Sequence, residues 1–192
     1  MEPQLPQLEM RLPSLASLPE VEVADGYALR TYREGDLAAW AALVSECIGG
    51  RYDEAACRES LLMGTPQFAP EDLFFAEKGD EVAGTACAHR KHAPAEGPGI
   101  IHMVGVFAAH RGHGLGRALV TSALVRLRDL GYRDAILSTD DFRLSAIRTY
   151  LGLGFRPVFS HPSHTGRWEA LYQQLGLSQE GQDETLSAEP SA

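Results

Sequence analysis

Residues 104–119 read VGVFAAHRGHGLGRAL, and this stretch decides the fold. An apolar run typical of a buried strand ends at Phe107, glycines follow at 112, 114 and 116, and a helical pattern starts directly behind them. Glycines leave the backbone bare, and a helix adds the free N–H groups of its first turn and the positive end of its dipole. The stretch therefore predicts a strand, a loop and a helix N-terminus that together bind a pyrophosphate. The simpler alternative is a glycine-rich turn that only joins the two elements.

The spacing of the glycines distinguishes between the known phosphate loops. A dinucleotide fingerprint needs a third glycine where Arg117 stands, and no nucleotide P-loop sequence occurs. The pattern Arg111-x-x-Gly114-x-Gly116 behind an apolar strand instead resembles the acetyl-CoA signature of the GNAT superfamily of N-acetyltransferases. The resemblance implies acetyl-CoA as co-substrate, bound by the strand, the loop and two flanking arginines, that is by Val104, Gly105, Val106, Arg111, Gly112, His113, Gly114, Leu115, Gly116 and Arg117.

The order of local patterns supports the same resemblance. Strands are expected at 27–32, 73–77, 81–89, 100–107, 134–138, 155–159 and 167–172, and helices from 37, over 54–63, 115–130 and 142–153. This order is similar to that of the acetyltransferases over residues 25–173. The resemblance implies an α/β fold with a central twisted mixed sheet flanked by helices and splayed between strands four and five.

Length and composition suggest how the chain is organised. Its 192 residues, 44% of them hydrophobic, suit one acetyltransferase domain at 25–175 with an acidic, disordered tail at 176–192. Residues 1–24 form a Pro/Leu-rich N-terminal arm, in which prolines at 3, 6, 13 and 19 exclude a stable helix. The arm is either mobile or an extended strip whose leucines pack on the domain.

Charge and cysteine content limit the kinds of partner and site that we expect. A net charge of −9 argues against a nucleic-acid partner and fits either a cationic substrate or simple solubility. Three widely spaced cysteines without a C-x-x-C pattern predict neither a disulfide framework nor a zinc site, so we expect no metal. The sequence shows no membrane span and no cleavable leader, so the expected location is cytoplasmic.

A second motif lies on the helix expected after the fifth strand. Members of the family carry N-x-x-A-x-x-x-Y-x-x-x-G-F there, and Ala146, Tyr150, Gly154 and Phe155 match it. Arg143 stands where the family has Asn, which puts any contact ascribed to that Asn in doubt. The run from His102 to Gly116 is also similar to mycothiol synthase-like members, although those proteins hold two such domains and this chain holds one.

The chemistry of amine acetylation needs a base for the amine and an acid for the departing thiolate. An alkyl amine has a pKa of about 10 and a thiol about 8.5, so both proton transfers need help at neutral pH. The resemblance implies Tyr150 as the general acid, because the family places a tyrosine beside the thioester sulfur there. His102 is the candidate base, since serotonin N-acetyltransferases have a histidine at this offset, and a water relay is the alternative. Strand alternation puts His102 on the same face as Val104 and Val106.

Two classes of function follow. The first is an N-acetyltransferase that moves an acetyl group from acetyl-CoA to an amine of a small molecule or peptide, with a cationic acceptor as one option. The second is a non-catalytic acyl-CoA-binding sensor or interaction module. The preference for acyl chain length and the formation of a homodimer, which is common in the family, are left open by the sequence.

Overall fold

Strands and helices of the chain fall into two units, each held together by its own contacts. The computed structural model describes residues 5–62 and 69–177. We call Ser14–Ala135 the glycine-loop unit, and Met1–Pro13 with Ile136–Ala192 the terminal unit. The turn signals at Gly64 and Pro66 and the tail beyond residue 177 lie outside the described residues.

The glycine-loop unit is built on four antiparallel strands in the order β2-β3-β4-β5. Their bounds are β2 (Ala28–Thr31), β3 (Leu73–Lys78), β4 (Glu81–His89) and β5 (Gly99–Val106). Each strand pairs with the next strand of the chain, and the hairpin expected around residues 78–80 joins β3 to β4. This unit therefore follows the expected order of elements.

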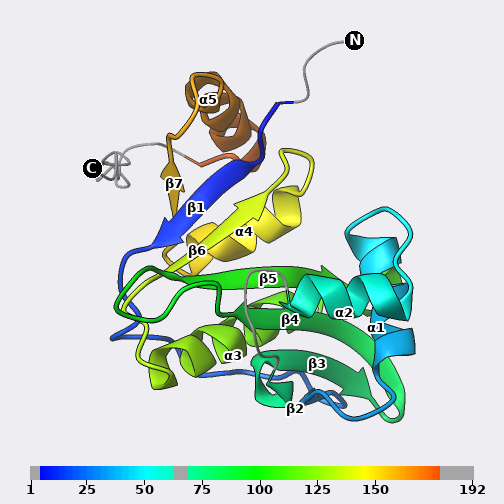
Figure 1. The fold of residues 1–192 in the computed structure, drawn as a ribbon. Helices are drawn as coiled ribbons and strands as arrows, with labels where there is room; N and C mark the ends of the chain where they lie inside the picture. The colour runs from blue at the N-terminus through cyan, green and yellow to red at the C-terminus, as the bar shows by residue number, and fades with distance from the viewer. Residues whose placement is uncertain (1–4, 63–68, 178–192) are drawn as a thin grey trace. The chain divides into compact units, whose positions relative to one another are not determined.

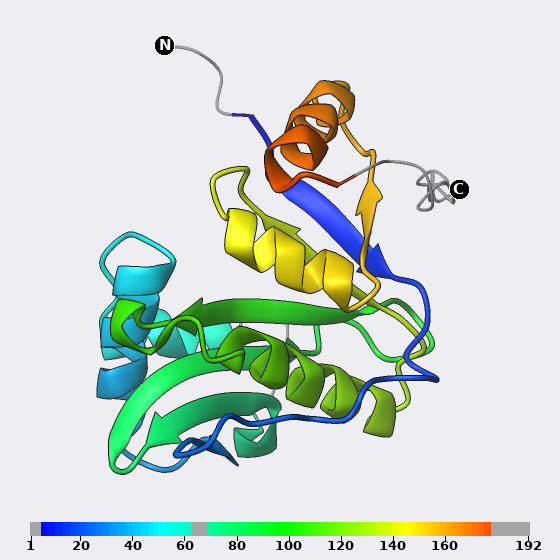
Figure 2. The same cartoon turned by 180° about the vertical axis from the view of Figure 1, so that it is seen from behind.

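Helices cover both faces of these strands (Figures 1 and 2). On one face lie α1 (Leu37–Cys47) and α2 (Glu54–Leu62), whose core with the sheet consists of Leu37, Trp40, Ala41, Val44, Cys57, Leu73, Phe75 and Cys87. On the other face lies α3 (Leu115–Asp129), where a Cβ on Gly84 would meet Leu119 at 3.0 Å. Two short 3-10 turns, η1 (Pro70–Asp72) and η2 (Ala108–His110), precede β3 and follow β5.

A glycine follows the last turn of α3 and ends the helix. Gly131 has φ +93, and its amide bonds to the carbonyl of Arg128 at 2.9 Å. The amide of Tyr132 reaches back to the carbonyl of Leu127 at 3.1 Å. The two bonds form a Schellman motif, which needs a left-handed residue at the position of Gly131.

A β-bulge interrupts β5. Cys87 pairs with His102 and Thr85 pairs with Gly105, so one strand has one more residue than the other between these pairs. Met103 takes φ +49 at this point, and it is the only non-glycine residue with positive φ in the described parts of the chain. Side chains that follow the bulge therefore point to the face opposite to the one that uninterrupted alternation predicts.

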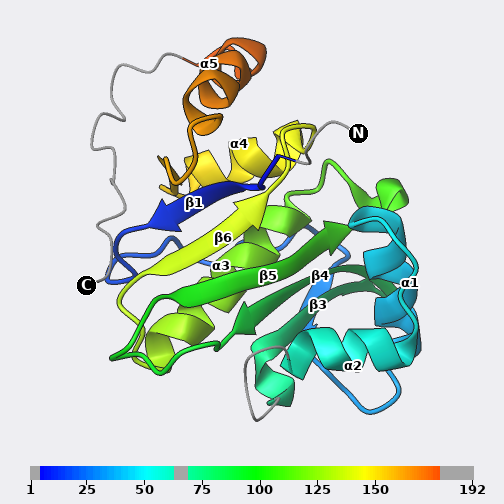
Figure 3. The same ribbon diagram turned by 45° about the horizontal axis from the view of Figure 1, so that its top comes forward.

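The terminal unit combines both ends of the chain. Its strands are β6 (Ala135–Thr139, of which only the first residue belongs to the other unit), β1 (Leu8–Leu12) and β7 (Arg156–Val158), in the order β6-β1-β7. Figure 3 shows β1 beside β6, and its pairing with β7 is antiparallel. The helices are α4 (Leu144–Gly152) and α5 (His164–Leu175), and Arg148 links them by donating to the carbonyl of Leu175 at 2.9 Å.

Residues 8–12 of the expected N-terminal arm form β1, in which Leu8, Met10 and Leu12 alternate with exposed residues and are buried. This agrees with the extended strip and not with the mobile arm. Prolines exclude a helix there but permit a short strand between them. One expectation is corrected in this unit. Residues 167–172, expected as a strand, belong to α5, where Trp168, Leu171, Tyr172 and Leu175 are buried at helical spacing.

The predicted α/β class is confirmed, since both units consist of strands with helices packed on them. The splay between the fourth and fifth predicted strands concerns the relation between the units and stays a prediction. Within the described residues, no helix has the length and apolar character needed to cross a bilayer.

Candidate functional site

The predicted phosphate loop lies between η2 and α3. After β5 the amide of Phe107 bonds to the carbonyl of Ala83 at 2.9 Å, which fixes the start of the loop on the edge of β4. Gly112 and Gly114 have φ +85 and +72, a left-handed conformation that other residues adopt only with strain. Alternating glycines are therefore required here by the path of the backbone.

The start of α3 presents the backbone amides of its first turn to an anion. Gly114 is the N-cap and has no side chain to accept from the first turn, which contains no acidic residue. The first amides of an α-helix, here those of Leu115 and Gly116, have no acceptor within the helix. A Cβ placed on Gly112, Gly114 or Gly116 would meet nothing within 4 Å. The loop is thus open at the positive end of a helix, and these residues fit a pyrophosphate.

Two arginines flank this loop in sequence. Arg111 folds back so that its Nε donates to the carbonyl of Val106 at 3.2 Å. Arg117 is exposed in the first turn of α3. Direct contact of either side chain with a phosphate stays a prediction.

At Val106 the backbone of β5 faces away from β4. Because the amide of Phe107 points to β4, the backbone groups of Val106 point away from it. Here the Val106 carbonyl accepts a hydrogen bond from Arg111 Nε at 3.2 Å, and the Val106 backbone also contacts the Cys47 thiol. The family resemblance implies that the Val106 backbone holds the pantetheine chain of CoA, and this contact stays a prediction.

The end of α1 reaches the same stretch of β5. A Cβ on Gly105 would lie 2.8 Å from the Cβ of Cys47, so the glycine is needed for the close approach of α1. Glu46 accepts from the amide of Ala108 at 3.4 Å. Burial raises the pKa of the Cys47 thiol, while Arg111 opposes the shift. No sequence pattern pointed to Glu46 or Cys47, because they are ordinary residues at the end of an amphipathic helix.

The candidate base His102 lies on a different face from the one expected. Residues paired across antiparallel strands share a face, so His102 faces the α1 side together with Cys87, Thr85 and Gly105. Val106 pairs with Gly84 and faces α3. The β-bulge at Met103 therefore overturns the expected common face of His102 and Val106.

The environment of His102 keeps its ring neutral. Its ring centroid lies 5.4 Å from that of His89, and its buried Nε2 has no hydrogen-bond partner among the described residues. Burial, with a smaller contribution from the charge of His89, lowers the pKa of His102 from 6.5 to about 4. Burial has this effect because removal from water disfavours the charged imidazolium.

The candidate acid Tyr150 belongs to α4 in the terminal unit. It is buried, with its ring centroid 5.9 Å from that of Phe155. Burial raises the pKa of Tyr150 to about 12, opposed by the nearby charge of Arg143. The phenol therefore keeps its proton at neutral pH and is a donor.

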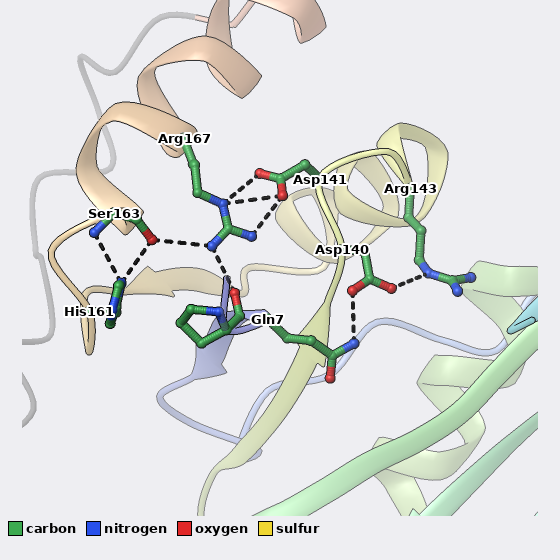
Figure 4. Close-up of polar contacts among 8 residues, drawn as sticks. Gln7, Asp140, Asp141, Arg143, His161, Ser163 and Arg167 are labelled. Atoms are coloured by element: carbon green, nitrogen blue, oxygen red, sulfur yellow. Dashed lines mark hydrogen bonds and ion pairs between the residues drawn. The ribbon is translucent and has the colours of Figure 1, made fainter. Parts of the chain in front are cut away.

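The residue that replaces the family's Asn is held by neighbouring side chains (Figure 4). Arg143 is the N-cap residue of α4, its Nε donates to Asp140 at 3.0 Å, and its guanidinium lies 5.0 Å from the ring centroid of Phe142. Gln7 donates to the other oxygen of Asp140 at 3.0 Å. The charge of Arg143 is therefore already balanced by a carboxylate.

Asp141 anchors α5 to the same loop. Arg167 donates to its carboxylate at 2.7 Å and to the carbonyl of Pro6 at 2.8 Å. The Arg167 guanidinium holds the pKa of the Asp141 carboxyl below its ordinary value, in spite of opposing desolvation. The Asp140-Asp141 pair joins the N-terminus to α5, and these contacts give it a structural role.

Comparisons with known proteins identify the family of this chain. Residues 37–155 match the acetyltransferase (GNAT) family. A mycothiol acetyltransferase of Thermobispora bispora is 34% identical over 153 residues, which cover 76% of this chain and 52% of that protein. The chain spans about half the length of the mycothiol acetyltransferases that it matches.

Solved structures show the same fold. A GCN5-related N-acetyltransferase of Sphaerobacter thermophilus is similar with a TM-score of 0.64 and 26% identity, over 80% of this chain and 49% of that one. Rv2747 of Mycobacterium tuberculosis, solved in complex with CoA, is similar with a TM-score of 0.55 and 23% identity, over 79% of this chain and 89% of that one.

Proposed function

The chain belongs to the GNAT family of acetyltransferases, and from this premise we propose that it transfers an acetyl group from acetyl-CoA to an amine. The observation that carries the proposal is the open glycine loop at the N-terminus of α3. Backbone amides of the glycine loop and of the first turn of α3 would hold the pyrophosphate of CoA, and the backbone of Val106 would hold its pantetheine chain.

The proposed roles of His102 and Tyr150 follow from their protonation states. Acetyl-CoA supplies a thioester, and transfer forms a carbon–nitrogen bond while the carbon–sulfur bond breaks. His102 is neutral above pH 4 and would accept the proton that the amine loses. Tyr150 is protonated at neutral pH and would give its proton to the sulfur that leaves. The acid and base return to their starting states when solvent exchanges both protons.

The acceptor is proposed as an amine of a small molecule or peptide. The acidic chain, with a net charge of −9, favours a cationic acceptor by long-range attraction. Similarity to mycothiol acetyltransferases makes small-molecule amines the first class to screen. Three unbridged cysteines fit a reducing compartment, so a cytoplasmic location remains our proposal, and a homodimer stays a prediction.

Substitutions at Gly116 test CoA binding without disturbing the fold. This residue has ordinary φ and open space beside it, so Gly116→Ala fits without strain. Gly116→Glu adds an anion to the first turn, where it stabilises the helix but repels a phosphate. We expect a saturating level of acetyl-CoA or CoA to raise the melting temperature of the unsubstituted protein by about 5–8 °C, and NAD to leave it unchanged.

The two variants give opposite results if the loop binds CoA. Gly116→Glu should melt at the same or a higher temperature than the unsubstituted protein, yet lose the shift with CoA. Gly116→Ala should keep most of that shift. A full shift in Gly116→Glu, or no shift with CoA in the unsubstituted protein, would overturn the proposed function.

A further inference from the structure

Beside the glycine loop stands a cluster that the proposed chemistry does not use. Its members are Tyr27, Lys78, His110 and His113, all in the glycine-loop unit. The Tyr27 and His113 ring centroids are 5.3 Å apart, and Lys78 Nζ lies 5.5 Å from the Tyr27 ring centroid. The Tyr27 ring therefore lies near both the amine of Lys78, in β3, and the imidazole of His113, in the loop.

A buried histidine, His110, holds the ring of Tyr27 in place. Tyr27 Oη lies 3.1 Å from Nδ1 of His110, which is 6% exposed. Nε2 of His110 lies 3.4 Å from Glu81 Oε1 and makes no hydrogen bond within the described residues. The hydroxyl bond and the edge-on packing of the two rings, with centroids 5.7 Å apart, hold Tyr27 against η2. Because η2 leads directly into the loop, this contact holds the Tyr27 ring beside the loop.

The chemistry of the cluster fits a phosphate that the loop itself cannot reach. Amides of the loop account for the pyrophosphate, whereas CoA carries a further phosphate on the 3′ oxygen of its ribose. Lys78 and His113 are exposed, so both side chains are accessible to a bound ligand. An ammonium and an imidazole supply donors suited to a phosphate monoester.

We propose that Lys78 and His113 bind the 3′-phosphate of CoA, with Tyr27 as a positioning residue that holds both beside the loop. This inference rests on the proposed function, because it assumes that the loop binds the pyrophosphate of CoA. It makes the protein selective for CoA over 3′-dephospho-CoA, a ligand that keeps the pyrophosphate, the pantetheine and the adenine.

The test is the ratio of two dissociation constants, measured by calorimetry with CoA and with 3′-dephospho-CoA. The unsubstituted protein should bind CoA about 10-fold more tightly, as expected for one charge-assisted contact. Lys78→Gln should reduce the ratio to about 2 while leaving the affinity for 3′-dephospho-CoA unchanged. Tyr27→Leu should lower the ratio in the same way, which a purely structural role would not do.

The chain offers a matched control, because its only other lysine, Lys91, is exposed in the loop between β4 and β5 of the same unit. Lys91→Gln should keep the 10-fold ratio. A ratio near 1 in the unsubstituted protein, or an unchanged ratio in Lys78→Gln, would overturn this inference and leave the proposed function intact. Failure to bind either nucleotide would overturn both.

Discussion

The two units differ in how far apart along the chain their contacting segments lie. In the glycine-loop unit, β2, β3, β4 and β5 each pair with the next strand in sequence. In the terminal unit, β1 pairs with β7 near the opposite end of the chain, and Gln7 bonds to Asp140 across 133 residues. The first arrangement is specified by turns and glycines that can be recognised locally. The second depends on long-range pairing, which no short pattern records.

The same comparison separates the proposed roles of the units. The glycine-loop unit holds all the backbone groups proposed for CoA binding, whereas the terminal unit contributes Tyr150. Substitutions in the glycine loop should therefore change binding, whereas a substitution at Tyr150 should change the rate and leave binding unchanged. Four predictions test this difference, from the largest effect to the smallest.

The first concerns Tyr150 in the terminal unit. Tyr150→Phe removes the proposed proton donor and keeps the ring that packs near Phe155. We expect kcat to fall about 10³-fold, or ~4 kcal/mol in the barrier, while the Kd for CoA changes less than about twofold. Steady-state rates and calorimetry on the same preparation check both values. Unchanged kcat would favour a water as the donor, and absence of turnover in the unsubstituted protein would favour the sensor hypothesis.

The second prediction tests whether the terminal unit depends on its N-terminal strand. Met10 is fully buried in β1, so Met10→Ala should lower the free energy of unfolding by ~3 kcal/mol. Glu9 is exposed on the same strand, and Glu9→Ala should change it by less than about 0.5 kcal/mol. Urea unfolding measures both. Equal, small effects would mean that residues 8–12 behave as a mobile arm, the other alternative that the sequence leaves open.

Strand β1 is an element that local sequence patterns do not predict. The prolines of residues 1–24 excluded a helix, but the short alternation of Leu8, Met10 and Leu12 is too brief to indicate a strand without its partner β7. In α5 the spacing of Trp168, Leu171 and Tyr172 was available, yet it was interpreted as a strand. The glycine loop succeeded because its requirements, positive φ and free amides, are satisfied by consecutive residues.

The candidate site, like the fold, was predictable only where a local motif specifies it. Loop residues 111–117 follow from one local motif, whereas Glu46 and Tyr27 reach the loop only through tertiary packing. His102 was identified by its residue type and offset, but its face depends on the β-bulge at Met103. The bulge at this residue moves the following side chains of β5 to the opposite face of the sheet. A methionine does not favour positive φ, so its residue type does not predict the bulge.

The third prediction uses the titration of His102. Its pKa is lowered on folding, so the unfolded chain binds more protons below pH 6.5, and stability falls as pH decreases from 6.5 towards 4. Between pH 7 and pH 5 we expect the unsubstituted protein to lose ~2 kcal/mol more stability than His102→Gln. His92→Gln, at an exposed position of the same unit, should behave like the unsubstituted protein. Parallel pH profiles for all three proteins would contradict the burial of a neutral ring.

The last prediction compares one glycine from each unit. Gly105→Ala should lower the free energy of unfolding by ~1.5 kcal/mol, because the new methyl would lie 2.8 Å from the Cβ of Cys47 and 3.0 Å from Leu43. Gly166, in the first turn of α5, has open space and ordinary φ, so Gly166→Ala should raise it by ~0.5 kcal/mol. Opposite signs in urea unfolding would show that the glycine of β5 serves close packing of α1, whereas the glycine of α5 serves no packing requirement. A stabilising Gly105→Ala would mean instead that α1 can move away from β5, and that the contact between them does not determine the shape of the site.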